Sequence, residues 1–435
     1  MSSQPLLESD GQISYVHSEQ GEIINSDNVF DHPIEEKLSM GGCFLILVNT
    51  AIGSGTLLIP YCYTSGVFTS LLISLLFGIV SYIAMTCLIE SGKNFRKYDY
   101  HELFAHCFGE RWMWIPDLMI FLVQFGSAMI YAHWNGRLLN RLIGSSNIIL
   151  GSNVFWVFAT SAIIAFPLTI FKDIQALEKL TALSFVFIII LIVHATFWLI
   201  KDVSELGFDP RNELRFFNFK RYDVIITAFG VNSMAYNCHI NVFSCIGHMK
   251  NCTFKRCKQL SIVVVAVAFL LYNMFGMITY FDLFDTLGNG SSLEYYPPRH
   301  WFTIITIIGV VIVLIISAPL VLWAARYSVN RILFKGRKMS NLRWIIIGGS
   351  MCIGAALLAA SSDNVLLFFD LVGGLFTPTI IFLMPGLFFV KSANSNTPLY
   401  KKIAAYFIIL FTIVAMVACT YQSISEIIKT AKGNE

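Results

Sequence analysis

Apolar stretches about as long as a membrane crossing alternate with short polar connections from residue 41 to residue 421. About 20 apolar residues cross the hydrocarbon core of a bilayer as a helix. The pattern therefore predicts an all-α integral membrane protein with eleven transmembrane helices, at 41–66, 67–90, 113–136, 153–171, 180–200, 222–246, 259–281, 301–325, 344–361, 365–390 and 403–421. An odd number of crossings places the two termini on opposite sides of the membrane.

The first predicted crossing is interrupted at its middle by Gly53-Ser54-Gly55. A membrane helix must satisfy its backbone polar groups internally, so such a break is tolerated where the freed groups face a cavity or a ligand. Asn49 precedes the break by one turn and Pro60 follows it, which favours a binding site. A kinked helix that packs closely against its neighbours through small residues would show the same local pattern.

The sixth predicted crossing is unusually polar for a helix that faces lipid. Six small or polar residues fall within twelve positions: Gly230, Asn232, Ser233, Asn237, His239 and Asn241. Two interrupted crossings five apart are typical of inverted five-helix repeats, whose broken helices meet around the substrate at the membrane midplane. Chance placement of two polar helices is the alternative. The pattern predicts a transmembrane domain over 39–421, with repeats at about 39–200 and 222–390 and an extra helix at 403–421.

The tenth predicted crossing carries Asp370 well inside the membrane. An ionisable group at that depth is a functional candidate. Gly373, Gly374 and Pro378 follow it, so a bent helix with local water would explain the same residues.

Composition and charge fix the class and the expected orientation. The chain is 56% hydrophobic and 13% charged, against about 25% charged in soluble domains. Of its 30 Lys and Arg residues, 20 fall in the connections on the N-terminal side, which predicts a cytoplasmic N-terminus. Residues 1–36 hold eight acids and no base, so we expect a disordered acidic tail over 1–38. A short extracytoplasmic tail is expected at 422–435, and a sequon in an outer loop predicts glycosylation at Asn289.

Several function classes are disfavoured by what the chain lacks. The predicted outer loops hold no cysteine, so the ten cysteines do not form a disulfide framework. We find no HExxH motif, nucleophile elbow or paired carboxylates at useful depth, which argues against an enzyme. The basic and aromatic loop at 91–112 suits an interfacial helix better than nucleic-acid binding. The expected partners are a small-molecule substrate and the bilayer, with a monomeric chain.

Several motifs resemble one family in the same order along the chain. The stretch NTAIGSGTLLIP, from Asn49 to Pro60, resembles the first-helix signature of the amino acid/auxin permease family, the transmembrane amino acid transporters. Within that family it is most similar to the sodium-coupled neutral amino acid transporters. The resemblance continues over residues 40 to about 421, through CHIN in the sixth crossing, the MKNCTFKRCKQL loop, SAPLVL with Arg326, and VGG through PGLF.

The resemblance implies a leucine-transporter-like fold, a 5+5 inverted repeat plus one extra helix, and alternating access. It implies uptake of amino acids, expected to be neutral, coupled to sodium or protons and without another cofactor. Family sodium sites use a first-helix asparagine and an eighth-helix hydroxyl, which here are Asn49 and Ser317. In a proton-coupled mode His239 or Asp370 would carry the proton. The membrane is the plasma membrane or a vacuolar or lysosomal one.

The break in the first crossing suggests how an amino acid would be held. Its carboxylate would meet the N–H groups of Ser54, Gly55 and Thr56 at the positive end of a helix dipole, with Thr50 and Gly53 beside them. Its ammonium would meet carbonyls freed where the sixth helix unwinds, expected around Phe229, Gly230 and Asn232. An amino acid sensor of the same fold with little flux is the alternative; a channel needs no pair of broken helices.

Overall fold

The computed structural model describes residues 38–144, 149–170, 174–206, 214–288, 290–362 and 364–431, with backbone alone for Ser54, 174–184, 206 and 429–431. Within these residues the protein is helical apart from one isolated bridge between Leu38 and Met249, so the all-α prediction is confirmed. The predicted tail at 1–37 and the predicted glycosylation site Asn289 lie outside the described residues.

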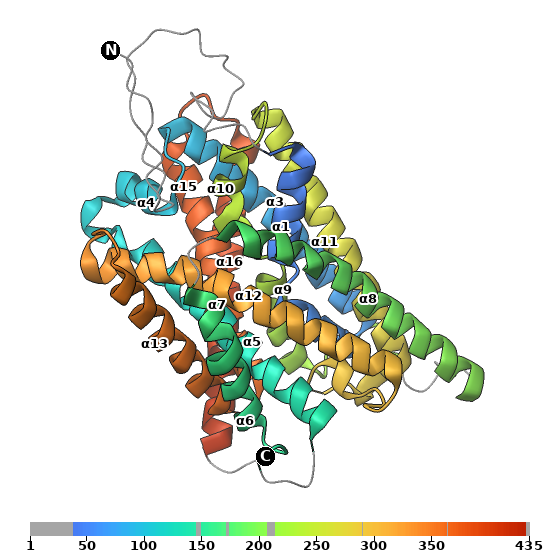
Figure 1. Ribbon diagram of the computed structural model, residues 1–435. Helices are drawn as coiled ribbons and strands as arrows, with labels where there is room; N and C mark the ends of the chain where they lie inside the picture. The colour runs from blue at the N-terminus through green and yellow to red at the C-terminus, as the bar shows by residue number, and fades with distance from the viewer. Residues whose placement is uncertain are drawn as a thin grey trace.

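Figure 1 shows a bundle of long helices, with α1 starting near the top and α16 ending near the bottom. The longer elements are α1 Met40–Ala51, α3 Val67–Phe95, α4 Tyr100–Phe108, α5 Trp114–Ile143, α8 Ile174–Leu206, α9 Tyr222–Ala235, α11 Phe254–Leu283, α12 Trp301–Phe334, α13 Asn341–Ala360, α15 Met384–Ser392 and α16 Leu399–Ala431. The shorter ones are η1 Ser54–Leu58, α2 Ile59–Cys62, η2 Tyr63–Ser65, η3 Glu110–Trp112, α6 Asn153–Phe158, η4 Ala159–Ala165, α7 Phe166–Ile170, η5 His239–Asn241, α10 Val242–Gly247, η6 Phe284–Thr286, η7 Ser292–Glu294, α14 Val365–Phe368, η8 Phe369–Phe376 and η9 Thr379–Leu383.

Nine helices of the described chain are long and apolar enough to cross a membrane, or ten with the bent first crossing. The exact count of eleven is therefore not confirmed. The predicted sixth crossing is split into α9 and α10, of 14 and 6 residues, and each piece is too short to span a bilayer alone.

The first crossing breaks where the sequence predicts it. α1 ends at Ala51, and the segments Met40–Ala51 and Gly55–Ser65 meet at an angle of 52°. Pro60 lies in the first turn of α2, where its missing N–H costs nothing and its fixed φ favours a helix start. The chain thus changes direction over a break of at most four residues.

The sixth crossing breaks later than predicted. Regular helix α9 continues to Ala235, and the unwound stretch is 236–238, before η5 and α10. The expectation that the helix unwinds around Phe229, Gly230 and Asn232 is therefore wrong in position. The reason is local, because Asn232 Nδ2 donates 2.8 Å to the Ala228 carbonyl and Ser233 Oγ donates 2.9 Å to the Phe229 carbonyl. Such bonds to the i−4 carbonyl are compatible with a continuous helix.

Helix α5 packs extensively against α12. Ion pairs anchor both of its ends. Near its start Asp117 receives the His101 Nδ1–H at 2.7 Å and lies 2.7 Å from an Arg331 nitrogen. Near its other end Arg137 forms a two-pronged pair with Glu294, with a shortest distance of 2.6 Å. Twenty residues separate these anchors, roughly 30 Å along a helix, so α5 is fixed across the whole apolar layer.

Several helices are longer than predicted, and the tenth crossing is irregular. For example, α16 reaches Ala431, beyond the predicted end at residue 421, and α8 Ile174–Leu206 extends beyond both ends of the predicted crossing at 180–200. The tenth crossing contains two π-helical segments, η8 and η9, around the glycine pair and Pro378. π-Helical turns are frequent at functional sites, and η8 packs against α9.

Candidate functional site

A cavity of about 40 Å³ lies against the break in the first crossing, and we call it the helix-one cavity. Four elements enclose it: the broken helix, α5, α8 and α12. Its lining residues are Ile52, Gly53, Thr56, Leu57, Tyr131, Phe187, Ile188, Leu191, Val310, Val313, Leu314 and Ser317. Gly53 and Thr56, both predicted substrate residues, and Ser317, a predicted sodium ligand, therefore share one cavity.

The polar groups of the helix-one cavity are few and are hydroxyls. A Cβ built on Gly53 would lie 3.3 Å from the Tyr131 hydroxyl, so glycine lets this hydroxyl approach the backbone at the break. Thr56 is 2% exposed, and its Oγ1 lies near the Tyr272 hydroxyl without a regular hydrogen bond to any described residue. A mostly apolar pocket with a few directed polar groups is the usual form of a small-molecule site.

The backbone at the break offers N–H groups to a ligand. Gly53 has extended backbone angles, and η1 starts directly after it at Ser54. The first N–H groups of a helix have no acceptor within it and carry a partial positive charge. Thr56 is the exception among the predicted donors, since its N–H reaches the Gly53 carbonyl at 3.2 Å. The groups suited to a carboxylate are therefore the N–H groups of Ser54 and Gly55.

The other face of the broken helix packs directly on α9. A Cβ on Gly55 would lie 3.0 Å from the Ala235 nitrogen and 3.2 Å from its Cα. Because these are backbone atoms that cannot rotate away, position 55 requires glycine for this approach. The sequence thus brings the two interrupted crossings into contact, as the repeat pattern predicts.

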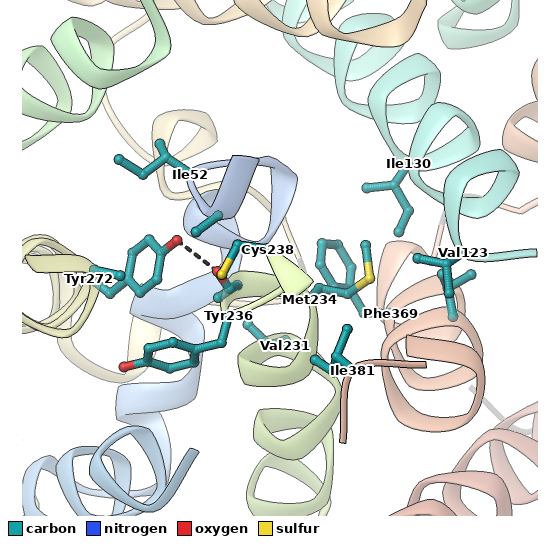
Figure 2. Packing of buried hydrophobic residues seen from close by; sticks show 14 of the residues in the cluster. Ile52, Val123, Ile130, Val231, Met234, Tyr236, Cys238, Tyr272, Phe369 and Ile381 are labelled. Atoms are coloured by element: carbon teal, nitrogen blue, oxygen red, sulfur yellow. Dashed lines mark hydrogen bonds between the residues drawn. The ribbon is translucent and has the colours of Figure 1, made fainter. Parts of the chain in front are cut away.

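The break in the sixth crossing is occupied by protein groups. The Tyr272 hydroxyl donates 2.8 Å to the Ala235 carbonyl, and Figure 2 shows this bond beside Tyr236 and Cys238. The Tyr236 hydroxyl lies 3.2 Å from Ser74 Oγ. Tyr272 of α11 thus replaces part of the lost helical bonding here, and Ser74 of α3 pairs with the side chain of Tyr236.

The segment before the first break, Leu38 and α1, and the segment after the sixth break, from η5 to Lys250, are joined by three sets of contacts. Asn241 Nδ2 donates to Thr50 Oγ1 at 3.1 Å. Each thiol of Cys43 and Cys245 lies within hydrogen-bonding range of the other residue's carbonyl, at 3.4 and 3.5 Å. Leu38 pairs with the His248–Lys250 backbone through two 2.9 Å hydrogen bonds. Thr50 therefore ties the two crossings together and does not line the cavity.

The remaining substrate predictions lie on α9, away from the helix-one cavity. Phe229 packs its ring on Phe77 and Phe411. A Cβ on Gly230 would lie 2.8 Å from the Phe369 carbonyl oxygen, so this glycine allows close packing on η8. Asn232 keeps a buried Oδ1 that has no hydrogen-bond partner among the described residues.

Asn49 shows the signature of an unsatisfied ligand atom. Its Oδ1 is buried and has no hydrogen bond in the described part of the chain. Ser317 lies in the helix-one cavity wall, on α12. An amide oxygen and a hydroxyl are both acceptable ligands for a hard cation.

Both predicted proton carriers are buried, and each has one side-chain atom without a hydrogen bond to a described residue. Asp370 is 1% exposed; Thr227 Oγ1 donates 3.3 Å to its Oδ2, while Oδ1 has no partner in the residues described. His239 is fully buried, donates from Nε2 to the Ser81 carbonyl at 3.1 Å, and leaves Nδ1 unpaired within the described chain. Each group could accept or release a proton at that atom.

Tyr131, Tyr272 and Phe187 were missed by sequence reasoning. Tyr131 lies in the third crossing, whose polar residues at 117–135 marked it as unusual, and that signal could have found it. Tyr272 and Phe187 lie in the seventh and fifth crossings, where a single aromatic residue is an ordinary packing group. Their roles follow from which helices meet.

Comparisons with known proteins agree with this geometry. A family model described as a transmembrane amino acid transporter protein matches residues 36–425. The putative sodium-coupled neutral amino acid transporter 11 of Danio rerio is 23% identical over 377 residues, covering 85% of this chain and 83% of that protein. The vacuolar amino acid transporter 7 of Saccharomyces cerevisiae is 27% identical over 298 residues, covering 66% of this chain and 58% of its own length.

Solved transporter structures share the fold. MhsT in complex with L-phenylalanine matches with a TM-score of 0.58 at 14% identity, covering 90% of this chain and 100% of that one. A sodium-coupled sialic acid symporter matches with a TM-score of 0.55 at 13% identity, covering 89% of this chain and 90% of its own. The predicted leucine-transporter-like fold class and the family resemblance are both confirmed. This multi-pass membrane protein belongs to the family of transmembrane amino acid transporters, which are not enzymes.

Proposed function

We propose that this protein is a secondary active transporter that moves neutral amino acids by alternating access, driven by a sodium or proton gradient. The observation that carries the proposal is the break at Gly53-Ser54-Gly55, because Gly53 lines an apolar cavity and a helix starts directly after it, whose first N–H groups have no acceptor within that helix. An amino acid carries a carboxylate for those groups and a side chain for that cavity. Apolar lining without a charged side chain favours a neutral substrate.

We infer two candidate coupling sites, one for sodium and one for protons, each with its own supporting residues. For sodium, the buried Asn49 Oδ1 and the Ser317 hydroxyl supply neutral oxygens on the first and eighth crossings. For protons, Asp370 supplies a buried carboxyl with one unpaired oxygen, packed behind α9. An ionisable group inside a membrane bundle is most often part of an ion or proton path. The relative named as sodium-coupled supports the first arrangement.

The proposed alternating access uses the way the two broken crossings are joined. Contacts of Thr50 with Asn241 and of Cys43 with Cys245 link α1, before the first break, to the segment η5–α10, after the sixth break. By contrast α5 is anchored at both ends by ion pairs. The proposed cycle moves the linked half-helices against the fixed α5–α12 pair, and thereby opens the site to one side at a time.

The test is uptake of a labelled panel of amino acids by purified protein in liposomes, with sodium and pH gradients imposed separately. Accumulation above the equilibrium level with either gradient supports the proposal. Ser317→Ala then removes sodium-driven accumulation, or Asp370→Asn removes pH-driven accumulation. Specific binding of an amino acid without flux under either gradient would instead identify a sensor of the same fold.

A further inference from the structure

One wall of the helix-one cavity is the ring of Phe187 on α8, which packs directly on Gly309 of α12. A Cβ added at Gly309 would overlap ring carbon Cε1 and would lie 2.7 Å from Cδ1 and 2.8 Å from Cζ. Cβ atoms do not approach other carbons so closely, so glycine at 309 is what allows the ring to take this position. The ring therefore has no further room to retreat toward α12.

Three other apolar wall residues are fixed by close packing. Ile188, Leu191 and Leu314 are 1%, 4% and 4% exposed. Side chains in such interiors occupy single rotamers with few voids around them. Phe187 is only partly buried, and its neighbours in sequence, Val186 and Ile189, are 47% and 44% exposed on the outer face of α8. Phe187 is thus the bulky lining residue on the edge between the cavity and the outside of the bundle.

The volume of the cavity limits what it can accept. A water-sized group needs about 10–15 Å³ on this measure, so 40 Å³ accommodates about three such groups. The side chain of valine has three carbon atoms, whereas leucine and phenylalanine have more. Charged side chains are disfavoured because the lining offers only hydroxyls to them.

We propose that Phe187, held in place by Gly309, sets the upper size limit of the transported side chain, and that the preferred substrates are small apolar α-amino acids up to about the size of valine. This inference rests on the proposed transport function and adds its substrate class. Phe187 acts on selectivity through the shape of the wall, while the break in the first crossing holds the common carboxylate.

The test compares uptake of labelled alanine, leucine and phenylalanine by liposomes that contain the full-length protein. Phe187→Leu and Phe187→Ala enlarge the cavity, and Phe187→Trp fills it, since the close contact with Gly309 prevents the larger ring from moving back. We expect the leucine-to-alanine uptake ratio to rise by about tenfold or more in the enlarged variants, because one or two methylene groups in an apolar pocket discriminate by about that factor. The ratio should fall in Phe187→Trp. Val186→Ala, on the lipid-facing side of the same turn, is the matched control and should leave the ratio unchanged.

The outcomes separate this inference from the proposed function. Absence of uptake of all three amino acids by the unmodified protein counts against the function itself. Uptake by the unmodified protein, with an unchanged ratio in Phe187→Leu and Phe187→Trp, overturns the role of Phe187. Preference of the unmodified protein for phenylalanine over alanine overturns the substrate class. If Phe187→Ala fails to elute as a single species, the leucine and tryptophan variants decide.

Discussion

The two interrupted crossings differ in which groups form hydrogen bonds with the backbone at the break. At the first break, Gly53 lines the helix-one cavity and η1 begins directly after it, so the first N–H groups of η1 have no acceptor within that helix. At the sixth break, Tyr272 from α11 already donates to the Ala235 carbonyl at 2.8 Å. One break is therefore prepared for a ligand and the other is completed by the protein.

This difference indicates that the two breaks have separate roles. A buried carbonyl without a partner costs free energy, so the protein lowers that cost at the sixth break with a tyrosine. We propose that a carboxylate binds the first N–H groups of η1, beside the helix-one cavity. Under this proposal substrate recognition is concentrated on the first crossing, and the sixth contributes its close contact at Ala235.

The largest expected effect comes from filling the contact between the breaks. Gly55→Val places a branched side chain where even a Cβ lies 3.0 Å from the Ala235 nitrogen, so the two crossings must separate. A displacement of about 1 Å at a binding site can cost about 100-fold in rate. We expect uptake to fall by about that factor or more, while the amount of protein in the membrane stays the same.

The matched control for this substitution is Gly41→Val. Gly41 lies at the exposed start of α1, and its Cβ would meet only Ser39 Oγ at 3.8 Å. Uptake should remain close to that of the unmodified protein. Normal uptake by Gly55→Val would show that the first break is not the substrate site.

The next effect concerns the carboxyl group behind the sixth crossing. Asp370→Asn keeps the size of the side chain and can keep the Thr227 hydrogen bond, but it cannot bind and release a proton. If protons drive uptake, this variant should lose accumulation under a pH gradient and keep exchange of labelled for unlabelled amino acid. Accumulation and exchange are measured on the same liposomes, and loss of both together would assign Asp370 to folding or to substrate binding instead.

A smaller effect distinguishes the two tyrosines at the sixth break. Tyr272→Phe leaves the Ala235 carbonyl without its donor, a cost of about 1–3 kcal/mol for a buried group. Tyr236→Phe should cost only about 0.5–1.5 kcal/mol, because Ser74 Oγ still receives a hydrogen bond from Asn273. Denaturant unfolding in detergent gives both values. Equal decreases in the free energy of unfolding of the two variants would mean that Tyr272 does not stabilise the break.

The smallest effect is expected at the link between the half-helices. Thr50→Val preserves the shape of the side chain and removes the hydroxyl that accepts from Asn241. Because Asn241 is only partly buried, the free energy of unfolding should fall by about 0.5–1.5 kcal/mol. Thr86→Val is the control, since its hydroxyl bonds only within its own helix, to the Ile83 carbonyl. A greater loss of uptake in Thr50→Val than in the control would support movement of α1 and α10 as one unit.

The sequence located the first break correctly because its cause is local. Gly53 and Gly55 lie close together with Pro60 shortly after them, and both residue types disfavour a continuous helix at that point. The sixth break was placed too early because Asn232 and Ser233 look like helix breakers, yet their side chains bond back to their own helix. Whether such a residue ends a helix depends on whether a neighbour such as Tyr272 can complete the exposed carbonyl.

The cavity wall could not be predicted from the pattern of residues. Phe187 lies in a run of apolar residues from Phe185 to Val193, and Gly309 is one small residue in a long apolar helix. Their importance arises only when α8 packs on α12 and the ring meets the glycine. Polar residues of the site such as Thr56 and Ser317 could thus be predicted from the sequence, whereas the size of the cavity depends on tertiary packing.

The most direct measurement is an experimental structure of the protein with the amino acid it transports best. We predict density for the carboxylate at the N–H groups of Ser54 and Gly55, with the side chain in the helix-one cavity against Phe187. A ligand bound elsewhere, or one that contacts the sixth crossing alone, would contradict the assignment of recognition to the first break.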